Sequence, residues 1–253
     1  TFMALLEKKF VAKDMYFSYV CKELANLHLE RDIRAKDAKY SVVFSYPSRS
    51  VLKPLDSLVP GPKKTRPLVV YSGLLSSYRG VETIVHAQTL CEFDLRIIFA
   101  EHQAAYVAQL GKLNDSLSTK GNLSARLFVP RNELQELLAE ADLGVIPILR
   151  RMPDSGELIE NHEIALTNKL FEYITAGLPV VVSDCEAQAE FVRSHKIGSV
   201  FESGDPHSFA EAFSWLIPRM EEMRERVASL APTCVWETQT DEVLEPYRHF
   251  LAQ

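Results

Sequence analysis

The sequence contains no long apolar run. None of its stretches approaches the ~18 uninterrupted apolar residues of a membrane-spanning helix, and the first ten residues reach their charges too early for a signal peptide. We therefore expect neither a transmembrane helix nor a signal peptide. Because the chain begins with Thr1 rather than Met, we interpret it as a fragment from which an upstream part has been removed.

Motifs that bind metals or form disulfides are also missing. The cysteines lie tens of residues apart, with no CxxC pair and no histidine in ligand spacing, which favours reduced thiols in a cytosolic protein. They are Cys21, Cys91, Cys185 and Cys234. The histidines form no HxxxH or HExxH motif, and the sequence has no Asp-x-Asp pair. We therefore predict a metal-independent reaction and no cofactor.

What is present is the composition of an ordinary globular protein. Hydrophobic residues make up 47% and charged residues 25% of the 253 residues, which excludes a disordered or fibrous chain. The net charge of −6 is unevenly spread, because residues 1–66 contain 13 basic and 7 acidic side chains and the rest contain 15 and 27. The basic part suits an anionic partner or forms a solvated face, since it has no run of five basic residues. The acidic remainder lacks a basic stripe, which argues against nucleic-acid binding.

Residues 60–66 are predicted to form a linker. They belong to a stretch with several prolines and consecutive polar residues, across which apolar periodicity vanishes. The pattern before it predicts one β-α-β unit over residues 1–59, with strands near 15–20 and 40–46 around a helix near 21–31. One such unit cannot cover both faces of a sheet, so we interpret it as part of a larger domain.

The chain after the linker alternates regularly between buried strands and amphipathic helices. Strands are expected over 67–73, 95–101, 125–130, 142–148, 178–184 and 198–202, and helices over 81–92, 104–113, 133–141, 168–176 and 187–195. This alternation predicts an α/β fold with a doubly wound parallel sheet over residues 67–218, covered by helices on both faces. Ligands of such sheets bind at the carboxyl ends of the strands. Two further helices, near 207–217 and 238–252, close the chain.

The sharpest local pattern surrounds the helix expected from residue 168. Thr167 is a favourable N-cap for a helix that begins at Asn168, and a glycine ends this helix before the next strand. The amides of Asn168 and Lys169 would then point out of the helix N-terminus, where the dipole favours an anion such as a diphosphate. Glu172 lies one turn further in on the same face, where a carboxylate can accept hydrogen bonds from the hydroxyls of a ribose. The alternative is a capped helix on which Lys169 and Glu172 form an ordinary surface pair.

This segment resembles the nucleotide-sugar site of retaining glycosyltransferases with the two-Rossmann GT-B architecture, especially family 4, the glycosyl transferases group 1. Members of that family often contain the pattern P-x-K-x-x-E-Y-x-A-x-G-x-P-V-V. The matching residues are Lys169, Glu172, Tyr173, Ala176, Gly177, Pro179, Val180 and Val181. The resemblance implies that Glu172 binds the ribose and that the helix start at Thr167, Asn168 and Lys169 holds the diphosphate.

The resemblance covers residues 67–218. It implies that they form the Rossmann-like C-terminal domain of a GT-B enzyme, which binds the nucleotide sugar. Residues 1–59 would then be the end of the acceptor-side domain.

A second element, over residues 69–87, is similar to the family's strand, glycine turn and basic residue before a helix. Gly73 permits close approach of the backbone to a ligand at the strand end. Arg79 stands where the family usually has a basic residue near the diphosphate, and a guanidinium there stabilises the charge of a leaving group. The resemblance therefore implies a catalytic role for Arg79, and the alternative is a solvated residue. Leu74 stands where the family commonly has a second basic residue.

The family's paired glutamates, E-x7-E, are incomplete in this chain. Ile164 occupies the position eight residues before Glu172, and Glu163 is one residue away from it. We expect a loop adjustment to bring Glu163 to the sugar as a catalytic carboxylate. At the end of the third strand of the sheet, Val129 and Arg131 lie where the family's backbone meets the base of the donor.

The resemblance implies a cytoplasmic glycosyltransferase. This chain would contain its donor-binding half, which transfers a sugar from an NDP-sugar to an acceptor hydroxyl with retention, in the synthesis of a surface polysaccharide or a glycolipid. The expected partners are the NDP-sugar and an acceptor saccharide or lipid-linked sugar, and the basic N-terminal segment suits peripheral contact with the inner face of a membrane. Two alternatives stay open, namely a non-catalytic nucleotide-binding or scaffold module of GT-B fold and a GT-B sugar-nucleotide epimerase.

Residues 219–253 are expected to return to the N-terminal unit. Val243, Leu244 and Tyr247 belong to an apolar stripe at helical spacing that needs a partner. In GT-B enzymes the last helix crosses back to the first domain, often with a tryptophan at the crossing, and Trp236 stands at that position here. The alternative is that the stripe covers the large domain's own sheet.

Overall fold

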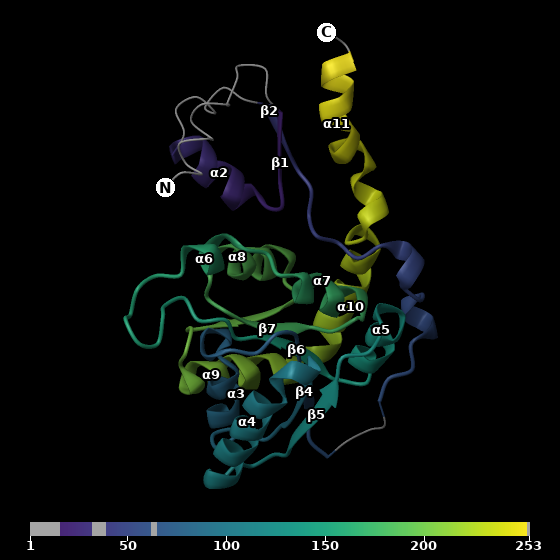
Figure 1. Cartoon of the computed structure of the whole chain (residues 1–253). Coiled ribbons are helices and arrows are strands. Elements are labelled where there is room, and N and C mark those ends of the chain that lie inside the picture. Colours follow the sequence, from purple (N-terminus) through teal and green to yellow (C-terminus); the bar gives the residue numbers. More distant parts are fainter. Residues whose placement is uncertain (1–15, 32–38, 62–64, 252–253) are drawn as a thin grey trace.

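The structure is a computed structural model that describes residues 16–31, 39–61 and 65–251. It contains two separate parallel sheets, one in a small unit and one in a larger body (Figure 1). The predicted linker lies partly outside the described residues.

The larger body is built on a six-stranded parallel sheet in the order β5-β4-β3-β6-β7-β8. Its strands are β3 (Leu68–Ser72), β4 (Asp94–Phe99), β5 (Leu123–Leu127), β6 (Leu143–Ile146), β7 (Val180–Ser183) and β8 (Gly198–Phe201). The strand order reverses between β3 and β6, which pair through Val69 with Leu143 and Val70 with Gly144. The predicted doubly wound parallel sheet is therefore confirmed, and its switch point lies between β3 and β6.

Helices cover both faces of this sheet. They are α3 (Val81–Ala87), α4 (Ala104–Ser116), α5 (Arg131–Ala139), α6 (Glu160–Ile164), α7 (Asn168–Thr175), α8 (Glu186–His195), α9 (Pro206–Leu216) and α10 (Met220–Leu230). Short 3-10 helices are η1 (Arg49–Val51), η2 (Leu55–Ser57), η3 (Ser77–Arg79), η4 (Glu101–Gln103), η5 (Ile217–Arg219), η6 (Ala231–Thr233) and η7 (Trp236–Gln239). Neither α6 nor α10 was predicted from the sequence.

The small unit consists of β1 (Tyr16–Tyr19), α2 (Lys22–Arg31) and β2 (Lys39–Val42), and β1 pairs with β2 in parallel. The last helix, α11 (Thr240–Leu251), lies beside both strands (Figure 1). Just before α11, the Trp236 N–H donates to the carbonyl of Pro47 at 2.9 Å. The chain therefore returns to the small unit at its C-terminal end, while the domain boundaries at residues 59 and 218 stay predictions.

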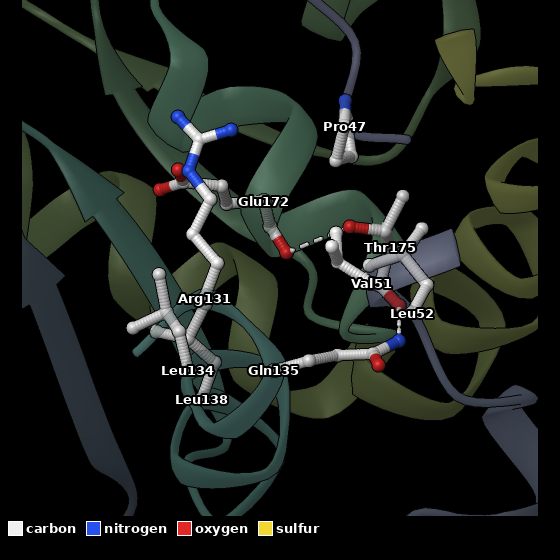
Figure 2. Close-up of a pocket in the computed structure, with 9 residues that line it drawn as sticks. All are labelled: Pro47, Val51, Leu52, Arg131, Leu134, Gln135, Leu138, Glu172 and Thr175. Carbon is white, nitrogen blue, oxygen red and sulfur yellow. Dashed lines mark hydrogen bonds between the residues drawn. The ribbon is translucent and has the colours of Figure 1, made fainter. Parts of the chain in front are cut away.

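The segment between β2 and β3 lies against α5 and α7 (Figure 2). Gln135 of α5 holds it, because its Oε1 accepts from the Lys53 N–H at 2.7 Å and its Nε2 donates to the Lys53 carbonyl at 3.1 Å. The same Nε2 donates to the Thr175 carbonyl of α7 at 2.6 Å. The segment is thus fixed to the two helices that carry Arg131 and Glu172.

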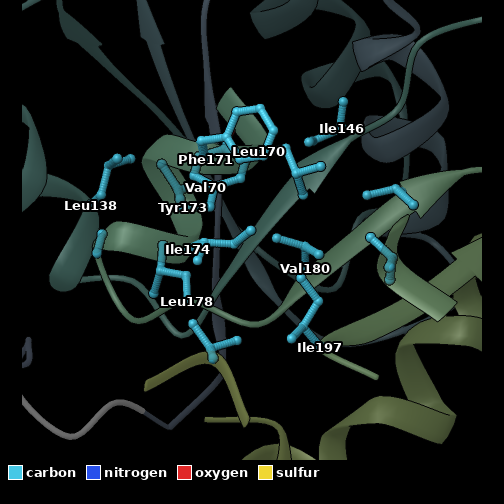
Figure 3. Packing of buried hydrophobic residues seen from close by; sticks show 14 of the residues in the cluster. Val70, Leu138, Ile146, Leu170, Phe171, Tyr173, Ile174, Leu178, Val180 and Ile197 are labelled. Atoms are coloured by element: carbon cyan, nitrogen blue, oxygen red, sulfur yellow. The ribbon is translucent and has the colours of Figure 1, made fainter. Parts of the chain in front are cut away.

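Alternation along the strands divides the core between the two faces of the sheet. Val70 packs with α5, α7 and α8 on one face, whereas Val69 and Tyr71 pack with α3, α4 and α9 on the other. Figure 3 shows the first face, where Leu170 of α7 and Val180 of β7 belong to one buried cluster. Each fully buried large aliphatic side chain contributes about 1.5–3 kcal/mol. The sheet edge that the strands present to a ligand is therefore rigidly supported from both sides.

Tyr173 fixes α7 to the centre of the sheet. A Cβ at Gly144 of β6 would lie 2.4 Å from Cδ2 of Tyr173, so only glycine leaves room for the ring. The Tyr173 hydroxyl accepts from the Ser72 N–H at 2.8 Å, at the carboxyl end of β3. Gly177, with φ +78°, ends the helix in the left-handed conformation that glycine favours. The N-terminus of α7 is consequently held beside the end of β3.

Candidate functional site

A pocket opens at the carboxyl ends of the strands, beside the switch point between β3 and β6. It is bounded by the turn after β3, the loop from β5 to α5, and the chain from α6 into α7. The residues that line it are Ser72, Gly73, Leu74, Arg79, Phe128, Val129, Arg131, Leu134, Asn161, Ala165, Thr167, Asn168, Lys169 and Glu172. All predicted site residues except Glu163 are among them.

Gly73 forms the turn that follows β3. Its φ is +142°, and its N–H donates to the carbonyl of Ile98 at 3.0 Å. A Cβ at this position would lie 2.9 Å from Cε and 3.0 Å from Nζ of Lys169. Glycine is needed here for two reasons, namely its backbone conformation and the lysine side chain that passes against it.

Arg79 ends η3 and is half-buried at the pocket. Gly80 follows with φ +70°, and a Cβ there would lie 2.0 Å from the Pro147 carbonyl oxygen. The Leu149 N–H donates to the Tyr78 carbonyl at 3.0 Å, so the turn after β3 and the loop after β6 are packed together. The Arg79 guanidinium lies 5.6 Å from the ring centroid of Tyr78. The cation is therefore held in the wall of the pocket by its backbone and by an aromatic ring.

Lys169 is buried, with 8% of its surface exposed, although it carries an amine. Its Nζ lies 5.1 Å from the ring centroid of Tyr71. The pKa of Lys169 is lowered to about 8, mainly by burial and also by the charge of Arg79, while the charge of Glu172 opposes both effects. Two cationic side chains consequently converge on the same end of the pocket.

Glu172 lies one turn into α7 and is half-buried. Burial raises the pKa of its carboxyl, while the charges of Arg131 and Lys169 oppose the rise. Figure 2 shows the Arg131 side chain reaching from α5 toward the carboxylate. The carboxylate thus lines the pocket together with Arg131 and with Val129 of the preceding loop.

Thr167 occupies the N-cap position of α7, as predicted, but its side chain makes no capping hydrogen bond. Its Oγ1 is buried and has no partner among the described residues. Asn168, the first residue of the helix, is exposed at the pocket. The Leu170 N–H donates to the Thr167 carbonyl at 3.0 Å, so the amides that the helix start offers to a ligand are those of Asn168 and Lys169.

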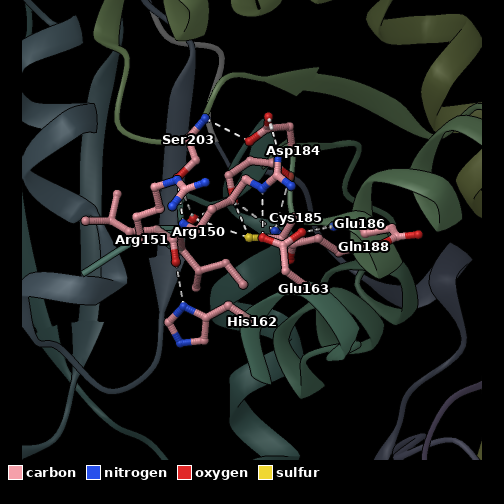
Figure 4. A network of polar contacts seen from close by, with 12 residues as sticks. Arg150, Arg151, His162, Glu163, Asp184, Cys185, Glu186, Gln188 and Ser203 are labelled. Carbon is pink, nitrogen blue, oxygen red and sulfur yellow. Dashed lines mark hydrogen bonds and ion pairs between the residues drawn. The ribbon is translucent and has the colours of Figure 1, made fainter. Parts of the chain in front are cut away.

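The structure does not bring Glu163 to the pocket, which corrects the sequence expectation. Glu163 is 6% exposed, and its carboxylate accepts from Arg150 Nε at 2.7 Å and from the Glu186 N–H at 3.3 Å (Figure 4). Arg150 also pairs with Asp184 at 3.2 Å. The reason is helical geometry, because residues two apart on a helix point to nearly opposite sides. Asn161 takes the pocket side of α6 instead.

Several residues that line the pocket were not predicted from the sequence. Ser72, Phe128 and Leu134 belong to elements that it placed at the site, so neighbourhood alone could have suggested them. Asn161 and Ala165 were missed because the short helix α6 was not expected. Their spacing of four residues, which puts both on one helical face, was the available signal.

The described part of the chain shows neither a metal-binding cluster nor a membrane-spanning helix. Within residues 16–31, 39–61 and 65–251, no group of three or more His, Cys, Asp or Glu side chains could hold a metal ion. In the same residues, no helix is long and apolar enough to cross a membrane.

The sheet order and the pocket at its switch point define a Rossmann-like α/β domain. Residues 56–232 match the sequence model of the family described as "Glycosyl transferases group 1", and the chain belongs to this family. The resemblance inferred from the two sequence motifs is thereby confirmed.

Solved structures share the fold. Sucrose-phosphate synthase from Thermosynechococcus elongatus has a TM-score of 0.69 at 16% identity, and the match covers 98% of this chain and 61% of the synthase. A glycosyltransferase from Rickettsia africae has a TM-score of 0.73 at 12% identity, with 92% and 63% covered. Alr3699/HepE from Anabaena, determined in complex with UDP and glucose, has a TM-score of 0.68 at 13% identity, with 91% and 62% covered.

These identities establish the GT-B fold alone. The chain spans between 61% and 63% of the length of those three structures. No curated protein sequence matches the chain.

Proposed function

We propose that the chain is the donor-binding part of a glycosyltransferase that moves a sugar from an NDP-sugar to an acceptor hydroxyl. The observation that carries this proposal is the shared pocket of Arg79, Lys169 and Glu172 at the N-terminal end of α7. The two cations suit the diphosphate of a nucleotide sugar, and the carboxylate suits the hydroxyls of the ribose next to it. The family to which the chain belongs supports the reaction type.

The diphosphate is proposed to lie at the start of α7. The first-turn amides and the helix dipole favour an anion there, and positive charge is added by Lys169 of α7 itself and by Arg79 from the turn after β3. Leu74 stands where the family commonly has a second basic residue, and the buried ammonium of Lys169 supplies charge in its place. Arg79 is the proposed catalytic cation, because its guanidinium can stabilise the charge that develops as the diphosphate leaves. The proposal requires no metal ion.

The nucleoside is proposed to extend from the diphosphate toward α5. Glu172 accepts hydrogen bonds from the two ribose hydroxyls, and the backbone near Val129 and Arg131 faces the base. The Anabaena structure with UDP and glucose supports a nucleotide sugar as the class of donor. Retention, a role in surface polysaccharide or glycolipid synthesis, and action in the cytoplasm or at the inner face of a membrane are proposed from the family resemblance.

A second candidate function is a nucleotide-binding module without transferase activity. It is favoured by one observation, namely that Glu163 is paired with Arg150 and so leaves the sugar end of the pocket without a carboxylate. The two candidates predict different behaviour toward the sugar. Only a transferase releases the nucleoside diphosphate from the donor in the presence of an acceptor.

Calorimetric titration of the chain with UDP, GDP and ADP tests the nucleotide site. We expect one of them to bind, and Glu172→Gln to weaken that binding by ~1–3 kcal/mol because the ribose hydroxyls lose a charged acceptor. Glu133→Gln, an exposed carboxylate of α5 away from the pocket, is the matched control. Equal affinity in wild type and Glu172→Gln would overturn the ribose assignment, and no binding of any nucleotide would overturn the function.

A further inference from the structure

The chain from α6 into α7 forms one continuous wall of the pocket. Glu172, Lys169 and Asn168 line it within α7, and Ala165 and Asn161 line it before the helix begins. If the diphosphate lies at the helix start, the nucleoside side of the ligand runs toward Glu172. The group on the other side of the diphosphate, the one to be transferred, then meets Ala165 and Asn161.

The acidic side chains of α6 are already engaged. Glu160 pairs with Arg31 of the small unit through both oxygens, at 3.0 and 3.2 Å. Glu163 pairs with Arg150 and the Glu186 N–H. Among the described residues that line the pocket, Glu172 is the one acidic side chain, and it lies at the opposite end.

Asn161 of α6 is a polar side chain on this part of the wall. It is exposed, lines the pocket and has no hydrogen-bond partner among the described residues. Apolar side chains line the same pocket, namely Ala165, which follows α6, and Leu74, which is 51% exposed on the turn after β3. An amide can both donate to and accept from a sugar hydroxyl, and methyl groups can cover the C–H face of the ring.

We propose that Asn161 is the specificity-determining residue for the transferred group, and that this group is an uncharged hexosyl. The inference rests on the proposed function of the pocket. A cationic amino sugar would find no carboxylate at this end, because Glu160 and Glu163 are paired elsewhere. A uronic acid would have to compete with the diphosphate for Arg79 and Lys169, the cations that converge at the diphosphate end of the pocket.

The test compares nucleotide with nucleotide sugar on the same chain by calorimetry. The base is first chosen by titrating UDP, GDP and ADP. If UDP binds, the ligands are UDP, UDP-glucose, UDP-galactose, UDP-N-acetylglucosamine and UDP-glucuronate; if GDP or ADP binds, they are GDP-mannose or ADP-glucose beside the nucleotide. We expect at least one neutral sugar to bind more tightly than the bare nucleoside diphosphate.

The variants are Asn161→Ala and a matched control, Asn132→Ala, which removes an exposed asparagine of α5 that does not line the pocket. Asn161→Ala is expected to weaken the neutral nucleotide sugar about 3- to 10-fold and the bare nucleotide less than twofold, which corresponds to one lost hydrogen bond. The control is expected to change neither.

Three results overturn the inference. In the first, Asn161→Ala still binds the nucleotide sugar more tightly than the bare nucleotide by the wild-type margin. In the second, Asn161→Ala loses the same affinity for both ligands. In the third, the wild-type chain gains no affinity from a neutral sugar, or gains more from the uronate. In all three the nucleotide still binds, so the nucleotide site of the proposed function stands. Failure of every nucleotide to bind overturns the proposed function, and this inference with it.

Discussion

At the scale of single residues, the burial of Lys169 decides the electrostatics of the pocket. Its ammonium is packed between the Gly73 turn and the Tyr71 ring, and no acidic side chain forms an ion pair with it among the described residues. An uncompensated cation in that position costs stability, because burial disfavours the charged form. A bound diphosphate would offset this cost by supplying the missing negative charge.

This residue predicts the pH dependence of nucleotide binding. With a pKa of about 8, the Lys169 side chain is mostly charged at pH 7 and mostly neutral at pH 9.5. Since the charged form attracts the diphosphate, the Kd of the nucleoside diphosphate should rise about 3- to 10-fold over this range, as Arg79 remains charged throughout. Calorimetry at a series of pH values measures the change.

The control for this prediction is Lys169→Met, which keeps much of the side-chain volume and removes the amine. Its binding should be weaker at pH 7 and nearly constant up to pH 9.5. A variant that keeps the wild-type pH profile would show that another group titrates.

The residue scale also shows what a sequence can reveal about this site. Lys169 and Glu172 were singled out by their offset from a helix start, and Gly73 and Arg79 by the family resemblance. That they line one pocket could be expected, because the fold brings strand ends and helix starts to one edge. Glu163 could not be assigned correctly, because its side depends on whether residues 160–164 form a loop or a helix. The helix turns it toward Arg150 and α8.

At the scale of elements, the pairs around Arg150 hold the long loop after β6 to α6, β7 and α8. Arg150 bonds Glu163 and Asp184, and Asp184 accepts from the Ser203 N–H at 2.9 Å (Figure 4). These contacts join four segments that are distant in the sequence. They hold α6, and through it the chain that leads into α7.

Glu163→Gln is therefore expected to act on stability. The change leaves the half-exposed Arg150 with Asp184 alone, which should lower the free energy of unfolding by about 1–2 kcal/mol, less than for a fully buried pair. Urea denaturation measures the loss. In a double-mutant cycle with Arg150→Gln, the two losses should not add. Unchanged stability together with a large loss of turnover would instead restore the catalytic role first expected for Glu163.

Element boundaries show where sequence reasoning stops. The strand expected over 125–130 is β5 at Leu123–Leu127, since this edge strand is mostly exposed and its pairing with β4, rather than an apolar run, defines it. Helix α10 was not predicted from the sequence. Its buried residues, Met223 and Val227, are four residues apart, and that spacing was a usable signal.

At the scale of the whole molecule, the small unit is attached to the larger body at separate places. Near α6, the Cys21 thiol donates to the Ile164 carbonyl at 2.7 Å, and Arg31 pairs with Glu160. Near η7, Gln239 is 4% exposed and bonds both backbone groups of Phe44, accepting from its N–H at 2.5 Å and donating to its carbonyl at 2.9 Å. The first attachment adjoins the proposed sugar end of the pocket.

Gln239→Leu tests the attachment at η7. The substitution leaves a buried N–H and a buried carbonyl of Phe44 unpaired, which costs about 1–3 kcal/mol. We expect amide hydrogen exchange to speed up in β2 and α11 while β3 and β6 keep their protection. Glu242→Gln, at an exposed position of α11, is the control. Uniform acceleration across the larger sheet would mean that the two parts unfold as one unit.

The central claim is that a nucleoside diphosphate binds at the carboxyl ends of β3 and β6, with its phosphates on α7. A crystal structure of the chain with the nucleotide selected by calorimetry tests it most directly. We predict the diphosphate at the first turn of α7, within reach of Arg79 and Lys169, and the ribose hydroxyls at hydrogen-bond distance from the Glu172 carboxylate. A nucleotide bound in any other cavity, or in this pocket with its ribose turned away from Glu172, would contradict the account.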